Sequence, residues 1–186
     1  MKITAAVLEH GGIPKGFEAA QALRVGEVDL APPGPGEVLI RVAAAGVCHS
    51  DLSVINGTRP RPVPMVLGHE ASGHVEEVGA GVTDLAPGDH VVCIFAPGCG
   101  TCLPCAEGRP ALCTRAAAHH GRGELMTGHR RLSREGAPVH HHVGVSAFAT
   151  HAVLARQSLV KVEADLPPHV SALFSCAMLT GAGAVF

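Results

Sequence analysis

Aromatic residues are scarce in this sequence of 186 residues, which has five Phe and neither Trp nor Tyr. Proteins that bind single-stranded nucleic acid stack the bases on aromatic side chains, so this scarcity argues against a surface that binds single-stranded nucleic acid by base stacking. Lys and Arg (14) nearly balance Asp and Glu (16), and the formal charge is −2. Without a basic excess, we expect neither nucleic acid nor an anionic membrane surface as a partner.

Long apolar runs and a leader segment are also lacking. The longest uncharged stretch, 170–186, is short for a membrane span and contains Gly181 and Gly183. Met1 leads directly into a strand-like run, so we predict no signal peptide. Seven cysteines without a secretory leader favour reduced thiols and metal binding over disulfides. We therefore expect a cytoplasmic, zinc-binding protein that does not span a membrane.

Glycine (23) and proline (14) are abundant, which favours short strands joined by turns over long helices. The strands that we predict cover residues 2–8, 23–30, 37–42, 71–78, 90–95, 148–154 and 159–162. Short helices are expected from about Ser50 to Ile55, over 168–177, and from 179 onward, whereas 58–65 and 114–142 are expected to be irregular. The fold class is mainly β with a few short helices, and the strand spacing suggests a closed or sandwich-like domain.

The strongest metal signal is a run with the spacing Cys-x2-Cys-x2-Cys-x7-Cys, formed by Cys99, Cys102, Cys105 and Cys113. Four thiolates on a tight lobe can surround one tetrahedral Zn²⁺ at about 2.3 Å per bond. Such a closed site stabilises the lobe and catalyses nothing. The alternatives are buried free cysteines, disulfides, for which Cys-x2-Cys pairs close awkwardly small loops, and an iron–sulfur cluster.

A second metal site is predicted from Cys48, His69 and Cys176. Two thiolates and one imidazole leave the fourth position of a tetrahedral zinc for water or substrate, as in catalytic sites. A carboxylate close in sequence, such as Asp51 or Glu70, can orient the imidazole through its other ring nitrogen. The alternative is that the two cysteines are small core residues and the histidine a satisfied core histidine. Cys93, in the apolar run 91–95, is assigned to packing.

The sequences around these residues resemble, in chain order, the motifs of the zinc-containing alcohol dehydrogenases of the medium-chain dehydrogenase/reductase superfamily. The segments that carry the resemblance are Gly46-Val47-Cys48-His49-Ser50-Asp51, Gly68-His69-Glu70-x2-Gly73-x5-Gly79-x2-Val82, Pro87-Gly88-Asp89-His90-Val91, Cys99-Gly100-x-Cys102-x2-Cys105-x2-Gly108-x4-Cys113 and Ser175-Cys176 with Thr180-Gly181. As a set these motifs are specific, and they cover essentially the whole chain.

The resemblance implies a GroES-like catalytic domain, an irregular β-barrel, over residues 1–175. It implies a structural-zinc lobe at 97–114 and, at 176–186, the start of a helical connection to a nucleotide-binding domain. Two zinc ions are implied, a catalytic one on Cys48, His69 and Cys176 and a structural one on the four-cysteine run.

Catalytic roles are implied for three further residues. Asp51 would orient His69, and Glu70 would lie behind the metal. Ser50 would accept the proton of the alcohol. Ser53 stands where many relatives carry a proton-relay histidine, so this relay would be shortened or replaced by solvent.

Cofactor and substrate positions are implied in the same way. His49 would approach the pyrophosphate of NAD(P), and Thr180 its nicotinamide end. Phe95 and His142 would line the substrate pocket. For the histidine run 140–142 a solvated loop is the competing interpretation.

Relatives continue into a nucleotide-binding domain with a Gly-x-Gly-x-x-Gly turn between strand and helix. The run 181–184 mimics the start of that turn, but no strand precedes it and the third glycine is missing. We therefore expect the Rossmann domain to be absent, and NAD(P) to bind only together with it.

These observations predict the zinc-bearing catalytic domain of an NAD(P)-dependent alcohol dehydrogenase, which would oxidise alcohols to aldehydes or ketones by zinc-assisted hydride transfer. Alone it would show little turnover. Its expected partner is a small alcohol or aldehyde, and the resemblance leaves room for a homo-oligomer. The alternative is a stand-alone GroES-like zinc-binding interaction module without enzyme activity.

Overall fold

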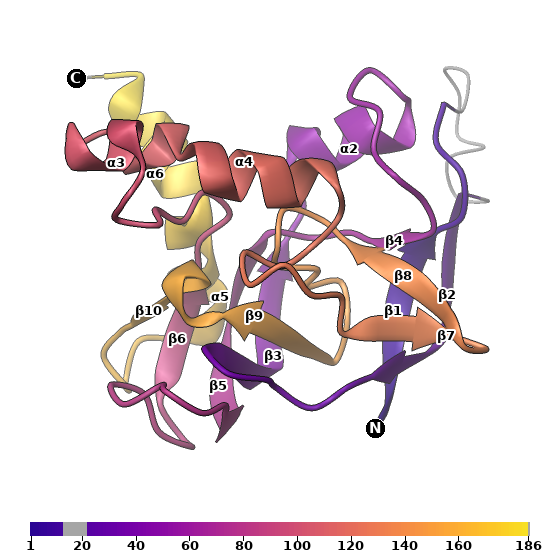
Figure 1. The fold of residues 1–186 in the computed structure, drawn as a ribbon, viewed down its shortest axis with the longest axis horizontal. Helices are drawn as coiled ribbons and strands as arrows, with labels where there is room; N and C mark the ends of the chain where they lie inside the picture. Colours follow the sequence, from indigo (N-terminus) through magenta and orange to yellow (C-terminus); the bar gives the residue numbers. More distant parts are fainter. Residues whose placement is uncertain (13–21, 186) are drawn as a thin grey trace.

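Two β-sheets form the body of the protein in the computed structural model, which describes residues 1–12 and 22–185 (Figure 1). One sheet closes into a barrel in the order β1-β2-β7-β8-β4, and the other has the order β10-β6-β5-β3-β9. The prediction of a mainly β fold with a few short helices is confirmed. Among the described residues, no helix has the length and apolar character needed to cross a membrane.

The barrel strands are β1 (Lys2–Leu8), β2 (Leu23–Leu30), β4 (Met65–Val66), β7 (Leu132–Arg134) and β8 (Ala137–His141). The other sheet contains β3 (Glu37–Gly46), β5 (Glu70–Val78), β6 (His90–Cys93), β9 (His151–Ala155) and β10 (Leu159–Lys161). The helices are α2 (His49–Ile55), α3 (Leu103–Ala106), α4 (Thr114–Gly121), α5 (Pro168–Ser171) and α6 (Ala177–Gly183), with 3₁₀ turns η1 (Pro110–Leu112), η2 (Arg156–Ser158) and η3 (Ala172–Ser175).

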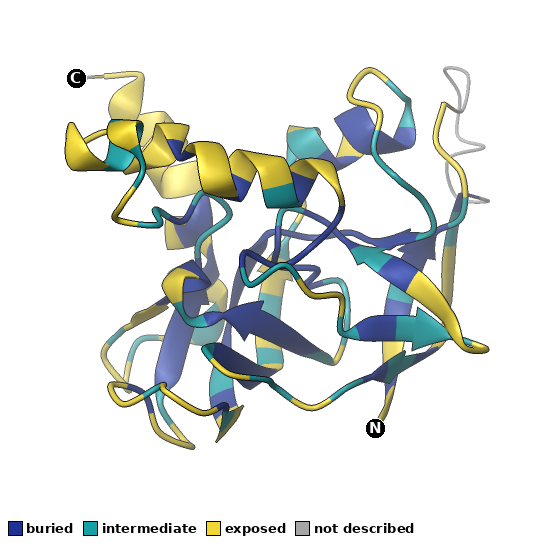
Figure 2. Ribbon diagram, viewed as in Figure 1, coloured by how far each residue is buried: buried dark blue, intermediate teal, exposed yellow. Residues whose placement is uncertain are grey.

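Alternating burial explains why these segments are strands. In β1, Ile3, Ala5 and Val7 are buried and point into the barrel, as a period of two requires. Figure 2 shows the same contrast for the whole chain, with buried strands and largely exposed helices α3, α4 and α6. Helices α2, α3, α4 and α6 gather at one end of the sheets (top in Figure 1). Cys93 is fully buried in the apolar cluster of the second sheet, which confirms its assignment to packing.

Strand β3 is longer than predicted, because the small residues after Val42 continue the strand to Gly46. They pair with the start of β5, so that Gly46 lies opposite Glu70. A Cβ on Gly73 would lie 2.4 Å from the carbonyl oxygen of Arg41, so only glycine permits this close approach of the two strands. The pairing places the residues after Gly46 beside those before Glu70.

The prediction of an irregular excursion over 114–142 is wrong. This segment contains α4, β7 and β8, and the last two complete the barrel. The fully buried carboxylate of Glu37 anchors it, accepting hydrogen bonds from Arg131 Nε (2.6 Å) and the Thr127 hydroxyl (2.6 Å). Polar residues at long sequence separation hold this segment in place, and the hydrophobic pattern gives no sign of them.

The helix predicted over 168–177 is interrupted. The chain forms α5 and η3, breaks at Cys176 (φ −151°, ψ −58°), and starts again as α6. Smaller differences occur elsewhere: β6 ends at Cys93 instead of residue 95, and β9 starts at His151 instead of residue 148. Phe186, in the last predicted helix, lies outside the described residues.

Candidate metal centre and pocket

Cys48 lies where β3 passes into α2 and occupies the N-cap position of that helix, which begins at His49, one residue before the predicted start near Ser50. Helix α2 ends before Asn56-Gly57, as predicted, with Gly57 at φ +78°. The Asp51 carboxylate accepts hydrogen bonds from the backbone N–H of Cys48 (3.1 Å) and of Gly68 (3.2 Å). One buried side chain therefore ties the two predicted ligand segments together.

His69 follows Gly68 and is 2% exposed. Gly68 has φ +90°, and a Cβ there would lie 2.6 Å from the backbone nitrogen of Phe148, so the turn that aims His69 requires glycine. His69 Nδ1 lies 3.4 Å from Asp51 Oδ1, which leaves Nε2 free to act as a ligand. Burial opposes protonation of His69, but the Asp51 carboxylate raises the pKa of its imidazole.

The electrostatics of Asp51 agree with this orienting position. Burial alone would raise the pKa of its carboxyl, but contacts with His142 and His69 hold that pKa well below its usual range. Asp51 is therefore ionised and acts as an acceptor for the groups around it.

Cys176 reaches the same place from the other end of the chain. Its neighbour Ser175 is buried and hydrogen bonds to β5 twice, accepting from Ala71 N–H (3.0 Å) and donating to the Ala71 carbonyl (2.9 Å). These bonds fix η3 against the strand that begins just after His69. The Sγ atoms of Cys48 and Cys176 are 3.9 Å apart.

The geometry of this group suits a zinc ion. One potential ligand atom from each of Cys48, His69, Glu70 and Cys176 lies within 4.8 Å of the others. Tetrahedral zinc with bonds of about 2.3 Å places two sulfurs about 3.8 Å apart, close to the 3.9 Å observed. Burial acts against ionisation of the Cys48 thiol, but hydrogen bonding to Ser50 and His69 lowers its pKa. Burial raises the pKa of Cys176 to about 11, so a nearby cation would be needed to make it a thiolate.

Glu70, expected behind the metal, is buried next to this group. A Cβ on Gly46 would lie 2.8 Å from a carboxylate oxygen of Glu70, so the glycine at the end of β3 makes space for this side chain. Its carboxylate is within the same 4.8 Å grouping and is available as a further oxygen donor.

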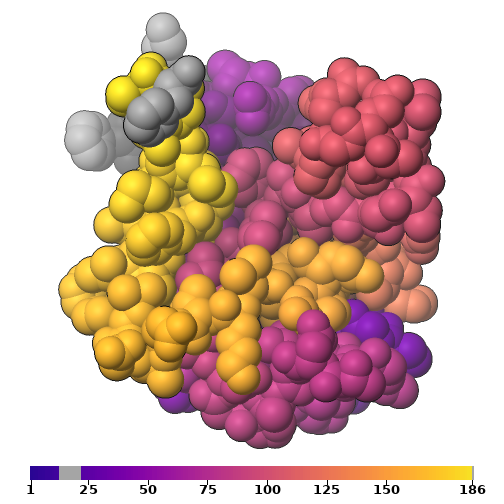
Figure 3. Space-filling model, turned by 90° about the vertical axis from the view of Figure 1, so that its left-hand side faces the viewer, coloured from indigo at the N-terminus to yellow at the C-terminus, as the bar shows by residue number. Residues whose placement is uncertain are grey.

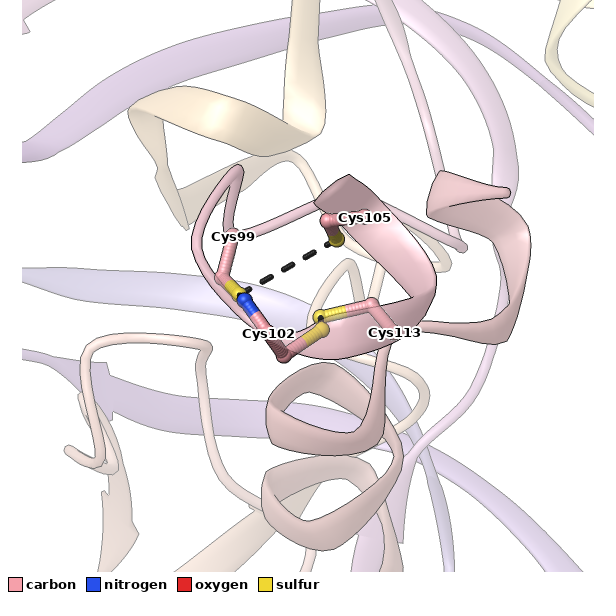
Figure 4. A group of neighbouring side chains, drawn as sticks. All are labelled: Cys99, Cys102, Cys105 and Cys113. Atoms are coloured by element: carbon pink, nitrogen blue, oxygen red, sulfur yellow. Dashed lines mark hydrogen bonds between the residues drawn. The ribbon is translucent and has the colours of Figure 1, made fainter. Parts of the chain in front are cut away.

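The predicted lobe brings all four of its cysteines together (Figure 4). Sγ–Sγ distances are 4.0 Å for Cys99–Cys105 and 3.8 Å for Cys102–Cys113, the spacing that tetrahedral zinc imposes. The backbone N–H groups of Cys102 and Ala116 donate to the sulfurs of Cys99 (3.3 Å) and Cys113 (3.4 Å). Hydrogen bonding with Thr101 lowers the pKa of Cys99 to about 5, which favours a thiolate there. None of the seven cysteines forms a disulfide.

A cavity of about 410 Å³ opens beside His69. Ser50, Phe95 and His142, which were predicted at the reaction site and substrate pocket, all line it, and their roles stay predictions. The ring of Phe95 meets His69 edge-on, with centroids 5.3 Å apart. In Figure 3 the surface is hollowed between the yellow C-terminal segment and the pink four-cysteine lobe.

The solvated-loop interpretation of the histidine run is wrong for two of its members. His141, the last residue of β8, and His142, which directly follows it, are 1% and 2% exposed. His142 Nδ1 lies 3.2 Å from Asp51 Oδ1, and its ring packs edge-on against His69. Asp51, His69 and His142 thus form a further polar group, fully buried, in which three potential ligand atoms come together.

The two predicted cofactor residues are near the metal centre but do not line the cavity. His49 is exposed on α2 and accepts the Ser53 hydroxyl at its carbonyl (3.0 Å). Thr180 is exposed on α6, with its hydroxyl 3.9 Å from Cys176 Sγ. Both therefore lie on the accessible side of the centre.

Sequence reasoning missed three polar residues of the cavity wall: Arg59, Arg61 and His120. Two arginines flanking a proline in the loop 58–65 were a visible signal, since a charged pair in a Pro-rich loop has no packing role. His120 stood in a stretch interpreted as irregular, and its position depends on α4.

Comparison with known proteins gives a consistent result. Residues 34–164 match the alcohol dehydrogenase GroES-like domain. A Mycobacterium tuberculosis protein whose name includes alcohol dehydrogenase D is 44% identical over 183 residues, which cover 98% of this chain and 47% of that protein. The S-(hydroxymethyl)glutathione dehydrogenase of Escherichia coli is 41% identical over 170 residues, covering 91% of this chain and 46% of its own length.

Solved structures agree. The alcohol dehydrogenase zinc-binding domain protein from Burkholderia ambifaria superposes with a TM-score of 0.87 at 37% identity, covering all of this chain and 48% of its own. Benzyl alcohol dehydrogenase from Acinetobacter calcoaceticus superposes with a TM-score of 0.85 at 35% identity, covering 99% of this chain and 47% of its own. The chain thus spans about half the length of the relatives that it matches. The predicted GroES-like fold is confirmed, and the chain belongs to the alcohol dehydrogenase GroES-like domain family.

Proposed function

We propose that this chain forms the zinc-bearing catalytic part of an NAD(P)-dependent alcohol dehydrogenase that interconverts small alcohols and aldehydes or ketones. The observation that carries the proposal is the convergence of Cys48, His69 and Cys176 beside a cavity. A thiolate–imidazole–thiolate set of this kind leaves one position of a tetrahedral ion available to a ligand in the cavity.

The chain's own residues would prepare the reaction in three ways. Asp51 would hold the His69 ring with Nε2 toward the metal, because it faces Nδ1. Ser50, which lines the cavity, would take the hydroxyl proton of the alcohol. Phe95 and Val54 would exclude water from the reacting carbon. A bound zinc would supply a Lewis acid that favours loss of the hydroxyl proton and polarises a carbonyl.

A second zinc ion on Cys99, Cys102, Cys105 and Cys113 would have a structural role. These four thiols fill a tetrahedral shell, which leaves no position for substrate. Seven unpaired cysteines, six of them in the two candidate metal groups, would suit the reducing cytoplasm, where we place the protein.

The hydride acceptor would be a nicotinamide dinucleotide. His49 and Thr180 are exposed near the metal centre and would contact its pyrophosphate and nicotinamide ends. Because the chain spans about half of its relatives, we propose that turnover requires the nucleotide-binding part of the enzyme as well.

Elemental analysis of the purified chain tests the metal assignment. We expect two zinc ions per chain, and one after Cys176→Ala, because this substitution removes one of the two sulfur ligands of the Cys48–His69–Cys176 group. Cys93→Ala is the matched control, since Cys93 is buried in an apolar cluster and should leave the count at two. An unchanged count in Cys176→Ala would remove Cys176 from the site and contradict the proposed function.

A further inference from the structure

We propose that the cavity beside the metal centre is selective for alcohols and aldehydes that carry an anionic carboxylate, which Arg59 and Arg61 would bind. The inference rests on the proposed function, which places the reacting hydroxyl at the His69 end of the same cavity. It adds a substrate class to that function.

The two arginines lack the partners that most arginines of this protein have. Seven arginines pair with a carboxylate: Arg41, Arg109, Arg122, Arg130, Arg131, Arg134 and Arg156. Within the described residues, Arg59 and Arg61 make no ion pair and no side-chain hydrogen bond, yet both line the cavity. A guanidinium carries five N–H donors in a planar fork that matches a carboxylate. Two such forks at one cavity are therefore available to a ligand.

Among the described residues that line the cavity, there is no carboxylate that would neutralise them, since none is Asp or Glu. The Asp51 carboxylate, which contacts the lining residues His69 and His142, is already engaged by these two rings and by the backbone N–H groups of Cys48 and Gly68. The two guanidinium charges would therefore attract an anionic ligand.

His120 adds an uncharged polar group to the cavity wall. It lines the cavity, is 8% exposed, and its Nε2 has no hydrogen-bond partner among the described residues. Burial, followed by the nearby charge of Arg61, lowers the pKa of His120 to about 4, so it is neutral at pH 7. A neutral imidazole carries no charge that would repel an anion, and it offers the ligand one more polar contact.

Much of the remaining wall is apolar. Val54, Phe95, Ala96, Ala116 and Ala117 line the cavity together with the polar groups. Its volume of about 410 Å³ lies within the usual range for a small-molecule site. A ligand with a hydroxyl at one end, a short methylene chain and a carboxylate at the other matches this distribution of groups.

The test compares two ligands of equal length, 6-hydroxyhexanoate and 1,6-hexanediol, by ligand-observed NMR titration of the zinc-loaded chain. We expect the hydroxy acid to bind about tenfold more tightly, the effect of one charge-assisted hydrogen bond. Arg61→Gln and Arg59→Gln should each remove most of that preference while diol binding stays within twofold. Arg24→Gln and Arg115→Gln are matched controls, because both residues are exposed, unpaired in the described structure and outside the cavity.

Equal affinity for the two ligands, or a preference that survives both cavity substitutions, would overturn the inference and leave the proposed function intact. Displacement of 6-hydroxyhexanoate by ADP in an Arg61-dependent manner would also overturn it, because the arginines would then serve the cofactor. Zinc is counted on the same samples. A count of one with an intact arginine-dependent preference would contradict the proposed function and support the anion site.

Discussion

The two candidate metal groups differ in how the chain assembles them. The four-cysteine lobe draws its ligands from fifteen consecutive positions, 99–113, on short helical turns. Cys48 and Cys176, in contrast, are 128 positions apart and meet at an Sγ–Sγ distance of 3.9 Å. The sulfur–sulfur distances in the two groups are nearly the same, so similar donor geometry arises from local sequence in one and from the whole fold in the other.

This difference decides what each group needs in order to persist. The lobe contributes little to the buried apolar core beyond Cys113, so we expect its order to depend on a bound metal. The second group is held without metal by Asp51, Gly68 and Ser175, each of which links segments distant in sequence. We expect the lobe to be metal-dependent in structure and the second group to be pre-organised.

The largest effect is expected from Cys102→Ser, which removes one ligand of the lobe. A structural zinc contributes on the order of 10 kcal/mol of apparent binding free energy, and most of it should be lost here. The zinc count should fall by one, and amide hydrogens of residues 99–113 should lose protection from exchange while the barrel strands keep theirs. Hydrogen-exchange mass spectrometry measures both regions at once.

Cys93→Ala provides the comparison for that variant. It also removes a thiol, but from the core, so it should lower global stability by about 1–2 kcal/mol without changing zinc content. A lobe that stays protected in Cys102→Ser would mean that its order does not depend on metal.

A Gly68→Ala substitution should damage the second group in preference to the lobe. The new Cβ would lie 2.6 Å from the backbone of Phe148 in a left-handed conformation, at a cost of about 4 kcal/mol in unfolding free energy. Displacement of His69 should then remove the second zinc while the lobe retains its own. Denaturant unfolding and metal analysis give the two results.

Gly26→Ala is the matched control for this strain. Gly26 lies in β2 with nothing within 4 Å of a Cβ position and no positive φ, so alanine should change the unfolding free energy by less than about 1 kcal/mol. If the two substitutions cost the same, the turn before His69 is not the feature that positions the histidine.

The sequence predicted most of what is local. Spacing alone indicated the four-cysteine group, and the strands predicted over 2–8 and 23–30 have the observed bounds of β1 and β2. The set Cys48, His69 and Cys176 rested on a family resemblance, because no local pattern reports a contact over 128 positions. Where the prediction failed, in 114–142, order comes from the buried carboxylate of Glu37 and its distant partners Arg131 and Thr127. The two cavity arginines were visible in the sequence on either side of Pro60, but only the fold shows that they line the cavity and lack partners among the described residues.

Acid should lower the stability of the barrel through His141. This effect belongs to the barrel and not to the two metal groups. Burial lowers the pKa of His141 to about 3, against about 6.5 in an unfolded chain. The unfolded state therefore binds more protons below pH 6.5, and stability falls from there towards pH 3. At pH 5 the loss from this residue amounts to about 2 kcal/mol. Denaturant unfolding between pH 7 and pH 5 measures it.

His141→Gln keeps an acceptor for the Arg131 N–H, which donates to His141 Nε2 at 3.1 Å, but cannot take up a proton in this range. The variant should lose about 2 kcal/mol less than the parent over the same pH interval. Equal losses in the two proteins would assign the acid sensitivity to other groups, the metal ligands among them.

The smallest expected effect, and the sharpest test of pre-organisation, comes from Ser175→Ala. Ser175 touches no ligand atom, yet its two hydrogen bonds to Ala71 align η3 so that Cys176 faces Cys48. Their loss should weaken zinc binding at this group about tenfold, near 1.4 kcal/mol, as for other residues that support metal ligands. Ser158→Ala is the control, because this buried hydroxyl has no hydrogen-bond partner among the described residues. Competition with a zinc chelator separates the two groups. Ser175→Ala should release the ion of the Cys48–His69–Cys176 group at a lower chelator concentration than the parent does, and the lobe ion at the same chelator concentration as the parent. Earlier release of both ions would show that Ser175 supports the whole fold and does not specifically align Cys176.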